Sequence, residues 1–219
     1  SGLVVAKDSG IKTFEDLKGK RVVTEFTAAP GSAAFTLAAL AIHGLSESDV
    51  RGISVPSLGA GVNAVKEGRA DAAYAATGMG VVTELDATRG ALFLSFDPTP
   101  ENWAKGDKII RSTPVAVVPR EGLVAIEANP TYLQGYRSYF LGRKDLSEEF
   151  VYNVVKAFVE NIDKFKEIHA QFRRIDVESL VGPGVTVPYH DGAIKYFKEA
   201  GLWTPEIQAR QDELLKTNK

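Results

Sequence analysis

Two junctions between a predicted strand and a predicted helix carry the residues best suited to hold a ligand. The first junction reads Thr24, Glu25, Phe26, Thr27, Ala28, Ala29, Pro30, Gly31, Ser32. A helix N-terminus leaves backbone N–H groups without partners and carries about half a positive charge, so a carboxylate or a phosphate can bind there. Gly31 would allow close approach, and the Ser32 hydroxyl would add a donor. These residues predict an anion site. An equally good interpretation is that Ser32 caps its own helix and Gly31 relieves a tight turn.

The second junction reads Tyr74, Ala75, Ala76, Thr77, Gly78, Met79, Gly80 and again places small residues between a strand and a helix. In an open α/β sheet, ligands bind outside the carboxyl ends of the strands, so we expect both junctions to face one cleft. The first junction does not match the glycine patterns of nucleotide-binding loops. The candidate ligand-binding residues are Thr24, Glu25, Ala29, Gly31, Ser32, Ala33, Tyr74, Thr77, Gly78 and Met79.

Residues suited to catalysis or metal binding are few. The chain has no cysteine, and His43, His169 and His190 are scattered without a metal-ligand partner at helical spacing. We expect His43 to serve the end of its helix, and Asp191, rather than His190, to cap the next one. Asp71 follows a turn that places it at the sheet edge opposite the junctions, which predicts a structural role. The sequence thus predicts no catalytic residue, no metal site and no cofactor.

The composition is that of an ordinary globular protein. Of 219 residues, 26 are Lys or Arg and 28 are Asp or Glu, which gives a formal net charge of -2. No basic field is present to hold phosphate backbones, so nucleic acid is not an expected partner. The longest mostly apolar run, residues 33–42, is far shorter than the roughly 20 residues that span a bilayer. Residues 1–6 predict a strand rather than a signal peptide, so a signal peptide, if one existed, has been removed.

The elements that must position the junctions alternate between short β-branched runs and helical patterns, which predicts an α/β fold with a mostly parallel sheet. Strands are predicted at 3–6, 21–26, 53–56, 70–77, 91–96 and 115–118. Helices are predicted at 13–19, 33–43, 60–67 and 81–87, the first with Thr13 as N-cap. Prolines weaken the periodicity over residues 97–129.

The C-terminal third is predicted to be mainly helical, after a strand-like run at 131–141. Ser147 is the expected N-cap of a helix whose apolar residues follow the i, i+3, i+4 rule from Phe150 to Ile162. Further helices are predicted at 163–172, 191–200 and 205–216. The change in composition near Thr131 indicates a change of lobe.

Five segments occur together along the chain: VVAKDSGI at 4–11, FEDLKGKRV at 14–22, GS at 31–32, GRADAA at 68–73 and HDGAIKYFKEAGLW at 190–203. In combination they resemble the TAXI-type solute receptors of tripartite ATP-independent periplasmic (TRAP) transporters. The resemblance implies a type II periplasmic binding fold, in which two α/β lobes enclose a small ligand.

The resemblance also implies a division of the chain into lobes. Residues 1–10 would end lobe 1 and cross over, 11–114 would form lobe 2, 115–130 a crossover region, and 131–219 the return to lobe 1 with C-terminal helices. Members of that family carry a βα segment before the position of Gly2, which this chain lacks. We therefore expect the first lobe to be incomplete and the strands at 3–6 and 131–141 to lack a neighbour.

The function implied by the resemblance is that of a periplasmic receptor without enzymatic activity. It would capture a small organic anion, a carboxylate or an amino acid, and deliver it to the membrane subunits of a TRAP permease. Glu25 and Phe26 stand where smaller residues are common in that family, and Glu25 would either repel an anion or pair with a ligand ammonium group. Two alternatives remain open: an enzyme on the same fold, similar to thiamine-pyrimidine synthases, and a ligand-sensing effector domain.

Overall fold

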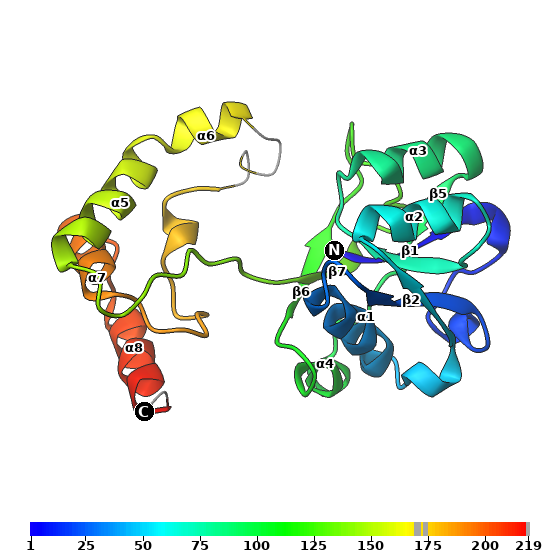
Figure 1. The fold of residues 1–219 in the computed structure, drawn as a ribbon, viewed down its shortest axis with the longest axis horizontal. Coiled ribbons are helices and arrows are strands. Elements are labelled where there is room, and N and C mark those ends of the chain that lie inside the picture. Colours follow the sequence, from blue (N-terminus) through cyan, green and yellow to red (C-terminus); the bar gives the residue numbers. More distant parts are fainter. Residues whose placement is uncertain (169–171, 173–174, 218–219) are drawn as a thin grey trace. The chain divides into compact units, whose positions relative to one another are not determined.

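The computed structural model describes residues 1–168, 172 and 175–217. The chain divides into two compact units, Ser1–Tyr136 and Arg137–Lys219, and each is considered by itself (Figure 1). Within the described part of the chain, every helix is too short or too polar to cross a bilayer. The predicted lobe boundaries at 10, 114 and 130 stay predictions, whereas the compact units meet between residues 136 and 137.

Unit 1 is built on a five-stranded sheet with the order β3 (Arg51–Val55), β2 (Arg21–Phe26), β4 (Ala72–Ala75), β1 (Gly2–Ala6), β5 (Ala91–Phe93). Strand β2 is parallel to β3 and β4, while β1 is antiparallel to β4 and β5. The α/β class is confirmed, and the sheet is mixed. The expectation that the strand at 3–6 lacks a neighbour is wrong, because β1 pairs with β4 on one side and with β5 on the other. All five residues of β1 are buried.

The helices of unit 1 follow the strands closely. They are α1 (Gly31–Ile42), α2 (Leu58–Lys66), α3 (Gly80–Arg89) and α4 (Pro100–Asp107). Figure 1 shows α2 and α3 on one side of the sheet and α1 on the other, where α1 packs against α4. Helices α1, α2 and α3 were predicted, but each begins one or two residues earlier than the sequence predicted. Helix α4 was not, although Pro100 at its first turn is a common helix start and Trp103 anchors it, donating to the Ser112 carbonyl oxygen at 2.9 Å.

A two-stranded ribbon completes unit 1. Strand β6 (Thr113–Val117) pairs antiparallel with β7 (Thr131–Gly135), so the predicted strand at 131–141 is shorter than expected and has a neighbour. Ser1 and Gln134 exchange two backbone hydrogen bonds, with the Gln134 N–H donating at 2.8 Å and the Ser1 amino group at 3.1 Å. These two bonds join the ribbon to the start of β1.

The predicted helix at 13–19 is a single 3₁₀ turn. Thr13 does not cap it; instead the Asp16 carboxylate accepts the N–H groups of Lys12 and Thr13, each at 2.9 Å. The described 3₁₀ turns are η1 (Lys7–Ser9), η2 (Glu15–Leu17), η3 (Glu47–Asp49) and η5 (Glu178–Leu180).

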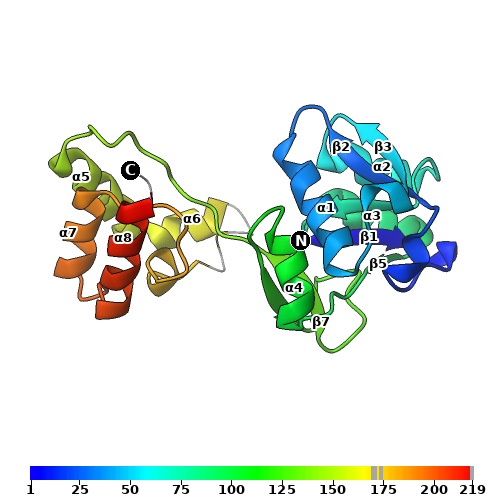
Figure 2. The ribbon, with the colours of Figure 1, turned by 90° about the horizontal axis from the view of Figure 1, so that it is seen from below.

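The described part of unit 2 is helical, as Figure 2 shows from below. It contains α5 (Glu148–Glu160), α6 (Ile162–Ile168), α7 (Asp191–Glu199) and α8 (Pro205–Thr217). The predicted cap of α5 is confirmed, because the Ser147 hydroxyl oxygen accepts the Phe150 N–H at 3.2 Å. The predicted helix at 163–172 is described only as far as Ile168; residues 169–171, His169 among them, lie outside the described residues.

Helix α7 is capped differently from the prediction. His190 is its N-cap, and His190 Nδ1 accepts the Gly192 N–H at 3.1 Å. Asp191 is therefore the first helical residue, where its charge complements the helix dipole.

Candidate functional site

Three helices begin at one edge of the sheet in unit 1. Strands β3, β2 and β4 are parallel and end at the same edge, and each is followed directly by α2, α1 or α3. We call this the carboxyl edge; it consists of the junction residues 27–31, 56–58 and 76–80. A helix N-terminus attracts negative charge, and three of them converge here. The predicted meeting of the two junctions at one sheet edge follows from this topology.

The first turns of these helices lack the charge that the other helices carry. No acidic residue lies in the first turn of α1, α2 or α3. By contrast, α4, α5, α6, α7 and α8 each begin with at least one Asp or Glu in the first turn. Because a first-turn carboxylate normally balances the helix dipole, the three helices at the carboxyl edge leave their positive ends without a local counter-charge.

Helix α1 begins two residues before the predicted start, which changes the role of Ser32. Its N-cap is Pro30, with no side-chain capping bond, and Ser32 lies inside the first turn. The interpretation of Ser32 as the cap is therefore wrong. The Ser32 N–H donates to the Ala29 carbonyl at 2.9 Å and the Ala33 N–H to the Pro30 carbonyl at 3.1 Å. Two of the predicted donors of α1 thus bond within the turn, and the half-buried Ser32 side chain remains a candidate for ligand contact.

Space is open above the glycines of the carboxyl edge. A Cβ atom placed on Gly31, Gly78 or Gly80 would meet no other heavy atom within 4 Å. Gly78 has a φ of 85°, in the left-handed region where glycine is favoured, so it is required by the turn itself. Gly31 has no such requirement, and its surroundings would also accommodate a side chain.

The loop before α1 is held firmly to the neighbouring strand. The Thr27 N–H donates to the Val55 carbonyl and the Ala28 N–H to the Pro56 carbonyl, both at 3.0 Å. Ala29 and Ala33 pack against the hydrophobic core. The two alanines support the loop, and the loop positions the start of α1 over the end of β2.

Thr24 lies at an irregularity in β2, because the pairing with β3 shifts between Val23 and Glu25. Thr24 is buried, and a Cβ on Gly52 of β3 would lie 2.7 Å from its hydroxyl oxygen. Thr24 therefore lies inside the sheet rather than in the loop. Glu25 is exposed and forms no ion pair with any residue that the structure describes.

Tyr74 faces the interior of unit 1. Its hydroxyl donates to Gln134 Oε1 at 3.0 Å, and Gln134 Nε2 donates to the Ser112 hydroxyl at 2.9 Å. Burial raises the pKa of the Tyr74 hydroxyl well above its usual value. The hydroxyl is thus used inside the protein, and the ring is also buried, with the Phe35 ring packed on it.

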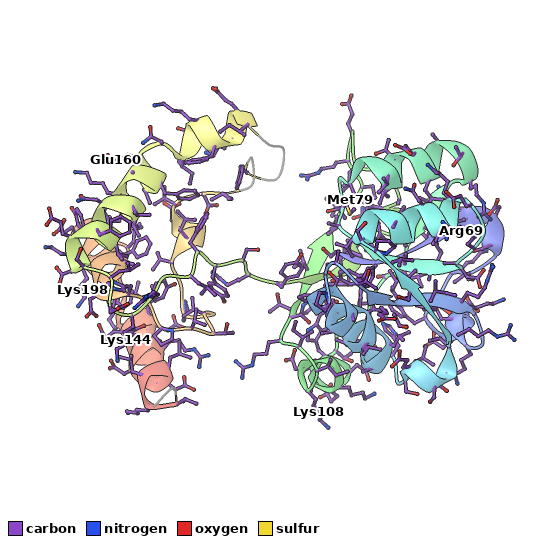
Figure 3. The ribbon with its side chains drawn as sticks, in the orientation of Figure 1. Arg69, Met79, Lys108, Lys144, Glu160 and Lys198 are labelled. Carbon is purple, nitrogen blue, oxygen red and sulfur yellow. The ribbon has the colours of Figure 1, made fainter. Side chains whose placement is uncertain are left out.

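The rest of the second junction stays near the surface. Thr77 is half-buried, and the Met79 thioether accepts the Ala76 N–H at 3.3 Å, which tightens the turn. Met79 is labelled in Figure 3, at the start of α3. The thioether also packs against the hydrophobic core, so Met79 links the junction to the sheet.

Two aromatic residues at this edge were missed by the sequence reasoning. The ring of Phe35, in the second turn of α1, lies with its centroid 5.8 Å from that of Tyr74 and 4.6 Å from that of Tyr136. Tyr136 is 49% exposed. The position of Phe35 one turn after Gly31 was visible in the sequence, whereas Tyr136 was hidden in the strand-like run at 131–141.

The described histidines have structural surroundings. The ring of His43 stacks on that of Phe14 with centroids 3.8 Å apart, and His43 Nε2 accepts the Asp97 N–H at 3.4 Å. His43 also forms the C-cap of α1, as predicted, and burial lowers its pKa. Among the described residues, no group of three His, Cys, Asp or Glu side chains could hold a metal ion.

Asp71 has the structural role predicted for it. Its carboxylate accepts from the Arg21 backbone N–H at 2.8 Å and from the Arg21 guanidinium at 2.6 Å. The guanidinium beside it holds the pKa of Asp71 below its usual value. The pair lies at the start of β2 and of β4, opposite the carboxyl edge, and fixes the register of these strands.

Residues 2–201 match the NMT1-like family, and the chain belongs to that family. This match does not distinguish TAXI-type receptors from other members of the family, so the assignment to TAXI-type receptors stays a prediction.

Three solved structures are similar to the chain. The periplasmic aliphatic sulphonate binding protein of Escherichia coli is 19% identical over 96% of this chain and 54% of that protein, with a TM-score of 0.44. The alkanesulfonate-binding protein of Xanthomonas axonopodis pv. citri, bound to MOPS, is 19% identical over 96% and 53%, with a TM-score of 0.43. A periplasmic sulfonate-binding protein of an ABC transporter from Methylobacillus flagellatus KT is 32% identical over 32% and 21%, with a TM-score of 0.28. The chain spans about half the length of the first two proteins.

Proposed function

We propose that this chain is the ligand-binding part of a receptor that captures a small organic anion outside the cytoplasmic membrane. The observation that carries the proposal is the convergence of three helix N-termini without first-turn acids at the carboxyl edge. Membership of the NMT1-like family and the similarity to periplasmic binding proteins agree with this role. The anion would supply the negative charge that these helices lack.

The partner in this proposal is a membrane permease of the TRAP type, as the resemblance of the sequence to TAXI-type receptors implies. The receptor binds its ligand without converting it. His43 and His190 support this part of the proposal, because both accept a backbone N–H group in the positions of helix caps. The gene neighbourhood tests the partner directly: adjacent genes for TRAP permease subunits support it, and adjacent genes for an ABC permease and ATPase contradict it.

A charge placed in the first turn of α1 tests the anion site. We expect Ser32→Asp to keep or raise stability, since a first-turn acid favours the helix by about 0.3–1 kcal/mol. The same charge should lower anion affinity at least tenfold. Ser32→Asn is the matched neutral control and should bind almost as the natural protein does.

Mass spectrometry of the purified protein identifies the bound anion. Isothermal titration calorimetry then measures the affinity of both variants for that anion. Equal affinity of Ser32→Asp and Ser32→Asn would contradict an anion site at α1. Turnover of that anion during incubation would contradict the receptor role and favour an enzyme.

A further inference from the structure

A loop runs along the free edge of β5, which is the last strand in the order of the sheet in unit 1. At one end of this loop the Phe93 N–H donates to the Ala125 carbonyl oxygen at 2.9 Å. At the other end the Phe96 N–H donates to the Tyr132 carbonyl oxygen, also at 2.9 Å. Between these two bonds the loop has six residues and the segment beside it has two, so the loop must bow away from the strand.

The bowed loop leaves a pocket with a volume of about 440 Å³, which is within the usual size of small-molecule sites. We call it the β5 pocket, and the residues of its lining that matter here are Lys7, Ile11, Lys12, Leu92, Ser95 and Glu127. Lys7 directly follows β1, which is antiparallel to β4, so the pocket begins at the sheet edge opposite the carboxyl edge. The β5 pocket therefore shares no residue with the anion site proposed above.

Charged groups of both signs line the β5 pocket. The Lys7 ammonium lies 2.9 Å from Glu127 Oε1, and this ion pair ties the bowed loop to the end of β1. The Lys12 ammonium forms no ion pair with any residue that the structure describes, so it is available to a ligand. A carboxylate has lone pairs for several donors, so Glu127 can accept a second ammonium group beside that of Lys7.

The rest of the lining combines apolar side chains with a hydroxyl group. Ile11 is buried in the hydrophobic core, and the half-buried Leu92 packs against that core. Ser95 Oγ accepts the Tyr132 N–H at 3.0 Å, which holds the side chain in place. A serine hydroxyl that accepts one bond can also donate one, so the Ser95 O–H can serve a ligand.

This combination of charges disfavours a ligand that carries charge of one sign only. A simple anion would be repelled by the Glu127 carboxylate, and a simple cation by the ammonium groups of Lys7 and Lys12. A zwitterion has a partner for each of its charges, because the pocket offers both an ammonium group and a carboxylate. The apolar lining adds a place for a hydrocarbon side chain.

We propose that the β5 pocket is a second binding site, which takes an α-amino acid with an apolar side chain. The carboxylate of the amino acid pairs with Lys12 and accepts the Ser95 O–H. Its ammonium group donates to Glu127, and its side chain lies against Ile11 and Leu92. The inference goes beyond the proposed function, because it concerns a different edge of the sheet and a different class of ligand.

Four matched probes test the ligand class by isothermal titration calorimetry on the whole chain. Leucine carries both charges and an apolar side chain. Of the other probes, 4-methylpentanoate lacks the ammonium group, 3-methylbutylamine lacks the carboxylate, and glycine lacks the side chain. We expect leucine to bind at least tenfold tighter than each of these three, because each loses one set of contacts. A smaller advantage of leucine over any of them, or no binding of leucine, would contradict the proposal.

Two substitutions test the charged contacts. Glu127→Gln keeps the size of the side chain and an oxygen for Lys7, and it should reduce the advantage of leucine over 4-methylpentanoate at least fivefold. Lys12→Gln should reduce the advantage of leucine over 3-methylbutylamine by a similar factor. Glu121→Gln and Lys108→Gln are the matched controls, because both residues are exposed and lie outside the β5 pocket, and both should leave these ratios unchanged. Unchanged ratios in Glu127→Gln and Lys12→Gln would overturn the proposal.

Ser32→Asp distinguishes the β5 pocket from the carboxyl edge. We expect leucine to bind this variant as tightly as it binds the natural protein. If the affinity for leucine falls in Ser32→Asp, leucine binds at the carboxyl edge, and the inference is wrong while the anion site gains support. If leucine does not bind at all, the inference is again wrong, whereas the proposed function still depends on the anion found in the purified protein and its loss in Ser32→Asp.

Discussion

The hydroxyl of Tyr74 donates to the side-chain oxygen of Gln134 across 3.0 Å, and both side chains are shielded from solvent. The other end of the same amide donates to the Ser112 hydroxyl at 2.9 Å. One buried amide therefore joins β4, β7 and the residue just before β6. A buried polar group is tolerated only where its partners are present, so the position of the ribbon on the sheet depends on Gln134.

We expect Gln134→Leu to lower the free energy of unfolding by about 2–4 kcal/mol, since it removes the buried amide that bonds to the hydroxyls of both Tyr74 and Ser112. Tyr74→Phe should cost less, because it leaves only one acceptor atom unpaired. Urea unfolding of both single variants and the double variant measures the coupling. Additive effects of the two substitutions would show that the bond contributes nothing in solution.

Replacement of Ser32 tests whether its side chain stabilises helix α1. Because Pro30 is the N-cap of α1, we expect Ser32→Ala to change the free energy of unfolding by less than about 0.5 kcal/mol. Ser147→Ala, which removes the hydroxyl that caps α5, should cost about 1 kcal/mol. Thermal and urea unfolding of the two variants gives the comparison. A larger loss in Ser32→Ala than in Ser147→Ala would restore the capping role.

Elements encoded by local patterns were predicted well. Strand β2 has the predicted bounds, and Ser147 caps α5 as the serine before an amphipathic helix should. The antiparallel position of β1 was missed, since it depends on pairing with β4 and β5, which are distant in sequence. Sequence patterns report which residues are buried but not which strand lies beside them.

Only part of the candidate site could be predicted, because sequence patterns do not report which elements lie side by side. Small residues at the two junctions indicated the carboxyl edge, and the parallel order of β2 and β4 places both junctions there. A pairing shift at Thr24 and the interior partner of Tyr74 were invisible in the sequence. The contact between the rings of Phe35 and Tyr136 requires the ribbon to lie beside α1, a tertiary contact that no local pattern encodes.

Gly192 allows α7 to pack closely on α5. A Cβ atom there would overlap the Glu148 carbonyl oxygen and lie 2.8 Å from the Tyr152 nitrogen, both of them backbone atoms that cannot turn away. We expect Gly192→Ala to destabilise unit 2 by about 2–3 kcal/mol through overpacking.

Hydrogen exchange of amides in α5 and α7 measures the effect of Gly192→Ala. Gly184→Ala is the control, because a Cβ on Gly184 would make only contacts of 3.4 Å or longer. The amides of α5 and α7 could exchange as slowly in Gly192→Ala as in the control. That result would mean that the two helices are less closely packed in solution.

The stability of the protein should fall as the pH drops from 7.5 to 5.5, and His43 should cause part of the loss. Burial lowers the pKa of His43 from 6.5, and this effect outweighs the attraction of Glu15 and Asp97 for the charged ring. The unfolded chain therefore takes up the proton first, so the contribution is present above about pH 6.5 and is lost as the pH falls below it.

His43→Gln isolates this contribution, because an amide oxygen can still accept the Asp97 N–H and does not titrate. Urea unfolding at several pH values should give a smaller slope for the variant between pH 7.5 and 5.5. Asp71 serves as an internal reference: Arg21 lowers its pKa from 3.8, so its contribution is present above that pH and is lost only at lower pH, in both proteins. An unchanged slope in His43→Gln between pH 7.5 and 5.5 would show that the folded protein accommodates a charged ring at this position.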